Sequence, residues 1–242
     1  MGAGDRPPFE LPSGQGSGSL FAAHTNAFLK SSFALLHHLR PGDWTFSTSQ
    51  MASGISAYDQ YRHIAELRAI AERYPEVKAS LGGDYVITPD IVVTKDPLSD
   101  PDIDSAGQII GGIDGLARLT PFRAASNPTP LPTLHASISC KWTIRSDRAQ
   151  NTRTEALNLI RNRKGKTPMI IVVTAEPLPR RISSIAVGTG DVDCTYHAAL
   201  YELLETAAQN KELLGDQLAE LETLIQGRRL RDISDLPFDL AI

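Results

Sequence analysis

The sequence predicts an α/β fold in which a mixed central sheet is flanked by helices. Two strand-like runs, at residues 134–143 and 168–175, enclose a helix-like segment at residues 151–163. Strand–helix–strand order implies a crossover between parallel strands of one sheet. With 242 residues and no internal repeat or domain-sized linker, the chain fits one domain. We expect that domain at residues 20–242, after a flexible arm rich in Gly, Pro and Ser at residues 1–19.

Two helices are expected before the strands that carry the chemistry. Apolar residues recur at helical spacing over residues 20–39, and a Pro-Gly pair ends the pattern. A second helical segment covers residues 57–73. Residues 84–95 indicate a strand pair or one bent strand, because Pro89 limits the ladder. Residues 96–133 are rich in Pro, Gly and Asp and are expected to form a loop.

The later elements follow from spacing and from apolar content. Thr152 and Glu155 stand where a capping box would begin the helix at residues 151–163. The run at residues 168–175 is continuously apolar, which is typical of a strand buried on both faces. Residues 194–226 predict one long helix or two, with an acidic face.

Composition excludes several classes of protein. No apolar run reaches the roughly 18 to 20 residues that span a membrane, and the N-terminus lacks a signal pattern, so we expect a cytoplasmic protein. Cys140 and Cys194 form no CxxC pair, which argues against a zinc site. The net charge of −4 is unusual for a protein that only coats nucleic acid.

Lys141 lies at the end of the otherwise apolar strand at residues 134–143. A buried ammonium group is costly unless an anion lies nearby. The simplest interpretation is that Lys141 extends to solvent along its own aliphatic stem. The alternative is that Lys141 belongs to a site that binds anions.

Two carboxylates favour the alternative. Asp90 stands at the head of an apolar strand, where it is either a turn residue after Pro89 or a metal ligand. Glu155 lies fourteen residues after Lys141 on the following helix, where it either closes the capping box or joins a site.

The charge of the chain is unevenly distributed around these residues. Residues 141–166 hold eight Lys and Arg against two Asp and Glu, a local charge of +6 in a chain of net −4. So concentrated a basic segment is either a phosphate-binding face or a solvated helix surface.

Together these residues suit the hydrolysis of a phosphodiester. Asp90 and Glu155 would hold Mg²⁺, with the main-chain carbonyl of Cys140 as a further oxygen ligand. The metal would polarise the phosphate and activate a water. Lys141 would neutralise developing charge, and Ser139 would complete the shell.

The same residues resemble a known group of nucleases. The PD-(D/E)xK superfamily carries Pro-Asp on one strand and acidic-x-Lys on the next, and this chain has Pro89-Asp90 and then Ser139-Cys140-Lys141. Serine in place of the acid, with Glu155 on the following helix, resembles the type II restriction endonucleases that recognise CCGG. The resemblance covers roughly residues 20–205. It implies a restriction-endonuclease-like fold and a Mg²⁺-dependent enzyme.

The resemblance also implies which residues read DNA. The segment Arg145-Ser146-Asp147-Arg148 would enter the major groove, where Arg145 and Arg148 bind guanine and Asp147 accepts from cytosine amino groups. A surface cluster of salt bridges is the alternative for this segment.

Three further residues are candidates for DNA contact. Gln15 would touch the minor groove. Arg180 and Arg181, expected in a loop after the buried strand, would contact outer bases or phosphates, unless they are simply exposed to solvent.

The implied substrate is a palindrome with a CCGG core, most simply GCCGGC. Cleavage after the first G would leave four-base 5′ CCGG overhangs with 5′-phosphates. A two-fold site requires two active sites, so a homodimer is expected, and the resemblance extends this to a dimer of dimers. A cognate DNA methyltransferase is expected in the cell.

One position departs from the pattern of these enzymes. Phe21-Ala22 stands where a Phe-Glu pair is expected on the first helix, so Glu10 or Glu66 would have to substitute for the missing acid. This departure motivates an alternative function, a catalytically weakened, sequence-specific DNA-binding protein of the same fold. A third possibility is an α/β domain with a basic face and no nuclease activity.

Overall fold

The computed structural model describes residues 14–48, 54–74, 76, 89–111, 115–187 and 190–242. A six-stranded sheet forms its centre, with the strands in the order β1-β2-β3-β4-β5-β6. The first three strands are antiparallel and β3 to β6 are parallel, so the sheet is mixed, as expected. The strands are β1 (Trp44–Ser47), β2 (Ile91–Lys95), β3 (Thr133–Lys141), β4 (Met169–Thr174), β5 (Cys194–His197) and β6 (Leu230–Asp232).

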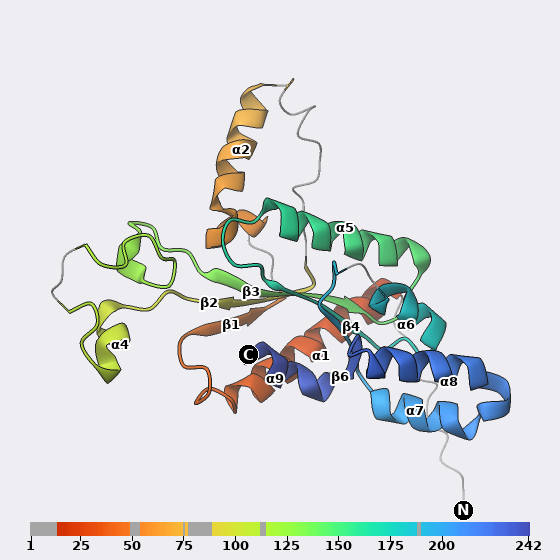
Figure 1. The fold of residues 1–242 in the computed structure, drawn as a ribbon. Helices are drawn as coiled ribbons and strands as arrows, with labels where there is room; N and C mark the ends of the chain where they lie inside the picture. Colours follow the sequence, from red (N-terminus) through yellow and green to blue (C-terminus); the bar gives the residue numbers. More distant parts are fainter. Residues whose placement is uncertain (1–13, 49–53, 75, 77–88, 112–114, 188–189) are drawn as a thin grey trace, which may run out of the picture.

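Helices cover both faces of this sheet (Figure 1). None of the described helices is long and apolar enough to cross a membrane. The α-helices are α1 (Gly14–Ala34), α2 (Arg62–Arg73), α4 (Asp100–Ile103), α5 (Ser146–Asn162), α6 (Pro179–Ala186), α7 (Leu200–Gln209), α8 (Lys211–Gln226) and α9 (Leu236–Leu240).

The alternation of side chains along the strands divides the core into two layers. On β4, Ile170 and Val172 pack with residues of α5, whereas Ile171 and Val173 pack with residues of α1 and α9. Because all four side chains are buried, β4 is covered on both faces, which the continuous apolar run predicted.

The first helix differs from its expected bounds. It begins at Gly14, inside the segment expected to be a flexible arm, so Gln15 is helical; residues 1–13 lie outside the described residues. It ends at Ala34, five residues early, and a turn follows. Buried Leu29 and Phe33 fix its inner face, whereas Leu35 is exposed, so packing stops supporting the helix there.

The helix after β3 also begins earlier than expected. Its first residue is Ser146, and Thr152 lies inside it as a buried residue. The capping box of Thr152 and Glu155 was therefore wrong. An acidic residue near a helix N-terminus is favourable, and Asp147 is the second residue of the helix that starts at Ser146.

Other differences lie in the second half of the chain. Cys194–His197, expected to begin a helix, forms β5, because buried Thr195 and Tyr196 suit a strand between two neighbours. Pro179–Ala186, expected to be a loop, forms α6. Of the helix expected at residues 57–73, only Arg62–Arg73 is α-helical, as α2; two short 3₁₀ turns, Gly54–Ala57 and Asp59–Tyr61, precede it. Of the strand expected at 84–95, residues 84–88 lie outside the described residues.

Candidate active site

The candidate site lies where β3 extends beyond its antiparallel neighbour. The first residue of β2, Ile91, pairs with Ile138. Strand β3 then continues to Lys141, supported from there by its parallel partner β4. The edge of β3 that β2 leaves uncovered is therefore next to Asp90, the residue immediately before β2.

Asp90 is the acceptor for the end of β3. Its Oδ2 atom accepts from the main-chain N–H of Cys140 at 2.7 Å, lies 3.3 Å from the Lys141 ammonium and 3.5 Å from the Ser139 hydroxyl. The three partners belong to consecutive residues of one strand. The side chain of Asp90 is 38% exposed and that of Lys141 is 17% exposed, so the ion pair faces solvent through the carboxylate.

Cys140 contributes its main chain and not its thiol. The thiol is buried on the α1 face of the sheet, where it contacts Thr25. Burial and the nearby Asp90 raise the pKa of the thiol to about 12, which keeps it protonated and unsuited to metal binding. The N–H and C=O of one strand residue point to the same edge, so the Cys140 carbonyl faces the Asp90 side.

Glu155 approaches from the helix above. It is partly buried on α5, and burial raises the pKa of its carboxyl group; Lys141 lowers that pKa, whereas Asp90 raises it. Two carboxylates and one ammonium therefore influence one another electrostatically. With the capping box absent, Glu155 has no helix-capping role to compete with this one.

These donors fit a hard divalent cation. Carboxylate and carbonyl oxygens are what Mg²⁺ prefers, and Mg²⁺ is commonly held by one or two carboxylates while it keeps several waters. Among the described residues, no group of three or more His, Cys, Asp and Glu comes close enough to enclose a metal.

The first helix supplies packing at this edge of the sheet. Phe21 meets Trp142 edge to face, and Ala22 is buried in the same cluster as Cys140. Of the acids expected to compensate for Ala22, Glu66 is exposed on α2, beside His63. Glu10 lies outside the described residues.

The expected DNA-reading segment stands at the start of α5. Arg145 is exposed directly before the helix, and Ser146, Asp147 and Arg148 form its first turn. The preceding Ile144 is buried, and its N–H donates to Glu176 Oε2 at 2.7 Å. The segment thus begins from a fixed point of the main chain.

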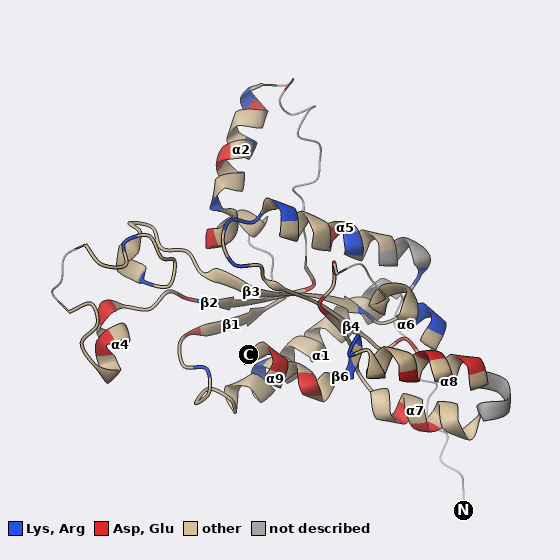
Figure 2. Cartoon of the chain, viewed as in Figure 1, with Lys and Arg blue, Asp and Glu red and all other residues tan. Residues whose placement is uncertain are grey.

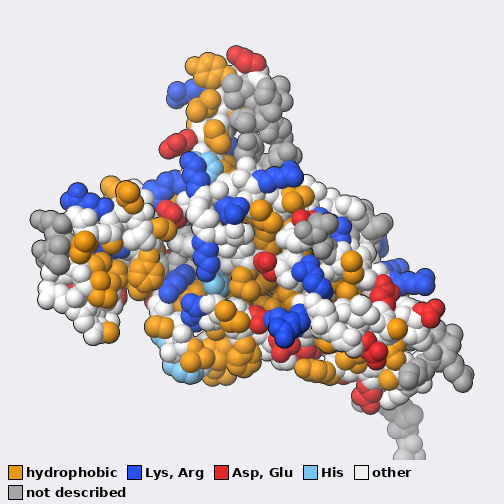
Figure 3. Space-filling model, in the orientation of Figure 1, with side chains coloured by type: hydrophobic (Ala, Val, Ile, Leu, Met, Phe, Trp, Pro, Cys, Tyr) orange, Lys and Arg blue, Asp and Glu red, His pale blue; other side chains and the backbone are white. Residues whose placement is uncertain are grey.

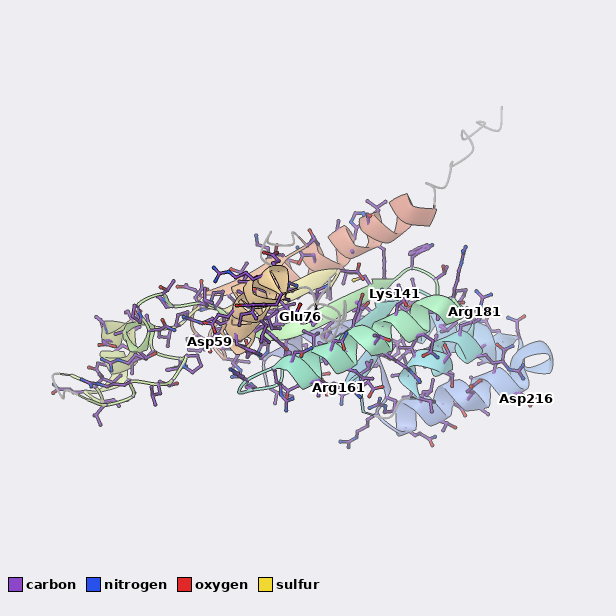
Figure 4. All side chains as sticks on the ribbon, turned by 90° about the horizontal axis from the view of Figure 1, so that it is seen from above. Asp59, Glu76, Lys141, Arg161, Arg181 and Asp216 are labelled. Atoms are coloured by element: carbon purple, nitrogen blue, oxygen red, sulfur yellow. The ribbon has the colours of Figure 1, made fainter. Side chains whose placement is uncertain are left out.

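The two later arginines lie on the first turn of α6. Arg180 and Arg181 are both exposed, and Arg181 is within 3.6 Å of Glu176. Figure 4 shows Lys141 and Arg181 towards one end of α5 and Arg161 towards the other. Lys141, a catalytic candidate, and Arg181, a candidate for DNA contact, therefore lie towards the same end of this helix.

The basic segment is only partly available to a ligand. Arg153 donates to the carbonyls of Ser184 and Val187 at the end of α6, and Arg163 donates to the carbonyl of Ile160. Figure 2 shows Lys and Arg along α5 and α6 but Asp and Glu along α7 and α8. The uneven charge predicted from the sequence thus separates α5 and α6, which carry Lys and Arg, from α7 and α8, which carry Asp and Glu.

Comparisons with known proteins identify the family of this chain. A model of the family described as NgoMIV restriction enzyme matches residues 9–242. The chain belongs to the NgoMIV restriction enzyme family. It is 50% identical, over 232 residues, to the type II restriction enzyme NgoMIV of Neisseria gonorrhoeae. The matched region covers 95% of this chain and 79% of that protein. The predicted restriction-endonuclease fold and enzyme class, a type II restriction endonuclease, are confirmed.

Sequence reasoning missed two residues beside the site of this NgoMIV-family enzyme. The Thr174 hydroxyl donates to the main-chain carbonyl of Lys141 at 2.7 Å, and Glu176 accepts from the N–H of Ile144. Glu176 is 1% exposed. A signal was present in the sequence, since an acid that directly follows a continuously apolar strand needs partners to be buried.

Proposed function

We propose that this enzyme cleaves double-stranded DNA with Mg²⁺ at a palindrome with a CCGG core. The proposal rests on one observation above all. Asp90, Lys141 and Glu155 influence one another at the edge of the sheet from which the Arg145–Arg148 segment departs. A hydrolytic site directly beside a base-reading segment is what site-specific cleavage requires.

Each residue of the site has a separate role in the proposed hydrolysis. Asp90, Glu155 and the Cys140 carbonyl would hold Mg²⁺, which when bound polarises the scissile phosphate and lowers the pKa of a water. Lys141, kept in place by Asp90, would orient that water and offset negative charge as it develops on the phosphate. The Ser139 hydroxyl, beside the same carboxylate, would complete the polar shell.

The proposed recognition uses the grooves of DNA. Arg145 and Arg148 would bind guanine O6 and N7, while Asp147 accepts from cytosine N4, with Ser146 between them. Arg180 and Arg181 would contact the outer base pair or the adjacent phosphates. Gln15, on the first turn of α1, would contact the minor groove.

We further propose GCCGGC as the site, with cleavage after the first G to leave 5′ CCGG overhangs and 5′-phosphates. The resemblance of Ser139-Cys140-Lys141 and Arg145–Arg148 to the CCGG-recognising enzymes supports this choice. The enzyme would act in the cytoplasm, where a cognate methyltransferase protects the host DNA.

A two-fold site calls for a homodimer, and we propose that two dimers associate. Support for a larger assembly comes from the lobe at residues 96–111 and 115–132, which projects from the body of the molecule (Figure 1). Apolar side chains cover much of that lobe on the face that Figure 3 shows. Its exposed large apolar residues are Ile109, Leu116, Leu119 and Phe122.

Digestion of a plasmid that contains GCCGGC sites tests this function. We expect discrete fragments with Mg²⁺ at a pH where the chain is folded, and the same fragments from repeat preparations. Chelation of the metal should abolish them. Smearing of the plasmid would contradict site-specific cleavage, and an intact plasmid would contradict nuclease activity.

A catalytically weakened DNA-binding protein is the second candidate, and buried Ala22 is the observation that favours it. No carboxylate stands at that position of α1, so the metal would be held by fewer acids than the family pattern provides. Retardation of a GCCGGC duplex without cleavage by Mg²⁺ or Mn²⁺ would favour this candidate over the enzyme.

A further inference from the structure

Glu176 is a buried carboxylate that takes no part in the hydrolysis proposed above. It lies two residues after Thr174, the last residue of β4, and is 1% exposed. Its Oε2 accepts from the N–H of Ile144 at 2.7 Å, and its Oε1 accepts from the N–H of Leu178 at 3.1 Å. A guanidinium nitrogen of Arg181 lies 3.6 Å from Oε2. A charge buried this deeply requires such partners.

The partners of Glu176 begin two separate DNA-reading elements. Ile144 directly precedes Arg145, so its N–H fixes where the segment before α5 starts. Leu178 is the residue that precedes α6, whose first turn carries Arg180 and Arg181. One carboxylate therefore ties the starts of both elements and also holds the Arg181 side chain.

The main chain of Glu176 is itself anchored. Its N–H donates to Thr174 Oγ1 at 3.1 Å, and that hydroxyl donates to the Lys141 carbonyl. Its carbonyl accepts from His197 Nε2 at 3.0 Å, and the other ring nitrogen accepts from the N–H of Ala199. Glu176 is thus linked to the end of β3 through Thr174, and to the ends of β4 and β5 by its own main chain.

We propose that Glu176 is a positioning residue for DNA recognition, which sets the spacing between the Arg145–Arg148 segment and Arg181. This inference rests on the proposed function. The ion pair restricts the conformations of Arg181 before DNA arrives, and such preorganisation lowers the entropic cost of binding. The interactions that join the side chains of Asp90, Lys141 and Glu155 do not include Glu176, whose link to Lys141 runs through Thr174 and the main chain. We therefore expect a change at Glu176 to affect the chemical step little.

Cleavage of two duplexes by the Glu176→Gln variant tests the inference. One duplex carries GCCGGC, and the other has its outer base pairs exchanged to give ACCGGT. We expect the KM for GCCGGC to rise about tenfold and the preference over ACCGGT to fall about tenfold, because a tenfold effect is the scale of one lost base contact. The kcat should stay within about threefold of the wild-type value. Glu222→Gln, at an exposed glutamate of α8, is the matched control.

A second comparison separates positioning from loss of folding. Arg181→Gln is made in the wild type and in Glu176→Asp, which keeps the charge but withdraws it from Arg181. We expect Arg181→Gln to cost less discrimination in the Glu176→Asp background, because the two residues act together. This comparison carries the test if Glu176→Gln does not fold.

These experiments distinguish a failure of the role inferred for Glu176 from a failure of the proposed function. Equal discrimination by wild type and Glu176→Gln, or an equal cost of Arg181→Gln in both backgrounds, would overturn the role of Glu176 alone. A wild-type enzyme that shows no preference for either duplex over DNA without CCGG would contradict the proposed function, and the inference with it.

Discussion

The two ends of β3 carry polar residues that are used in opposite ways. At its start, His135 lies 2.9 Å from the Leu240 carbonyl through Nε2 and meets the Trp44 ring edge to face at 4.9 Å. A carbonyl can only accept, so the imidazole donates. At its end, Asp90 gathers Cys140 and Lys141 while more than a third of its side chain stays exposed.

This difference shows how a polar group with a structural role can be distinguished from one that binds a ligand or takes part in catalysis. The contacts of His135 tie β3 to the C-terminal residues of the chain. Those of Asp90 all fall on one oxygen, Oδ2, of a carboxylate that has four lone-pair sites. A charged group that remains exposed and keeps acceptor capacity is suited to a ligand, and this is why we assign chemistry to the end of β3.

The largest expected effect is at Lys141. In Lys141→Ala, the scissile phosphate loses its nearby positive charge, so the cleavage rate should fall about a thousandfold or more. Affinity for a GCCGGC duplex, measured in Ca²⁺, should change little. Lys30→Ala, at an exposed lysine of α1, is the control. Cleavage that survives in Lys141→Ala removes this residue from the mechanism.

A smaller effect is expected at the start of α5. Arg148→Ala should weaken binding of GCCGGC by about 1 to 3 kcal/mol, the value of one bidentate base contact. Arg161→Ala, at an exposed arginine near the far end of the same helix, should change binding less (Figure 4). Titration of a labelled duplex measures both. Equal losses in the two variants would mean that α5 contributes general charge and not base recognition.

The smallest effect is expected at the start of β3 and concerns stability. Burial, and the charges of Lys166, Arg40 and Lys95, lower the pKa of His135 from 6.5 to about 4, although its hydrogen bond to Leu240 acts in the opposite direction. The unfolded chain therefore binds the proton first as the pH falls. The contribution of His135 is intact above pH 6.5 and is lost between pH 6.5 and about 4.

The shift from 6.5 to about 4 corresponds to an upper limit of about 3 kcal/mol, at about 1.4 kcal/mol per pKa unit. Because solvent partly reaches the ring and screens it, we expect a loss on the order of 1 kcal/mol. Urea unfolding at several pH values measures it. His135→Gln keeps a donor for Leu240 but does not titrate, so its acid loss should be smaller than that of the wild type. His38→Asn, at an exposed histidine, is the control, and matching pH curves for all three proteins contradict the assignment.

Sequence patterns located the parts of this enzyme that depend on local order. The apolar run of β4 and the Lys141 end of β3 were predicted, because each depends on residues close in the chain. The contact of Asp90 with Lys141 was a hypothesis, and the structure places the two groups 3.3 Å apart.

The missed features depend on tertiary contacts. From the sequence alone, Cys194–His197 resembles the start of the following helix, and only its place between β4 and β6 shows it to be a strand. The helix start at Ser146 and the partners of Glu176 depend on packing between α5, β4 and α6. Local propensity carries no information on such contacts, which is why Glu176 escaped the sequence analysis.

Sequencing the ends of a digested random-sequence DNA library tests the central claim most directly. Our account predicts that the wild-type enzyme with Mg²⁺ produces ends that begin with 5′ CCGG and derive from GCCGGC, and that Lys141→Ala produces none above background. Ends without a shared sequence, or a shared site that lacks CCGG, would contradict it.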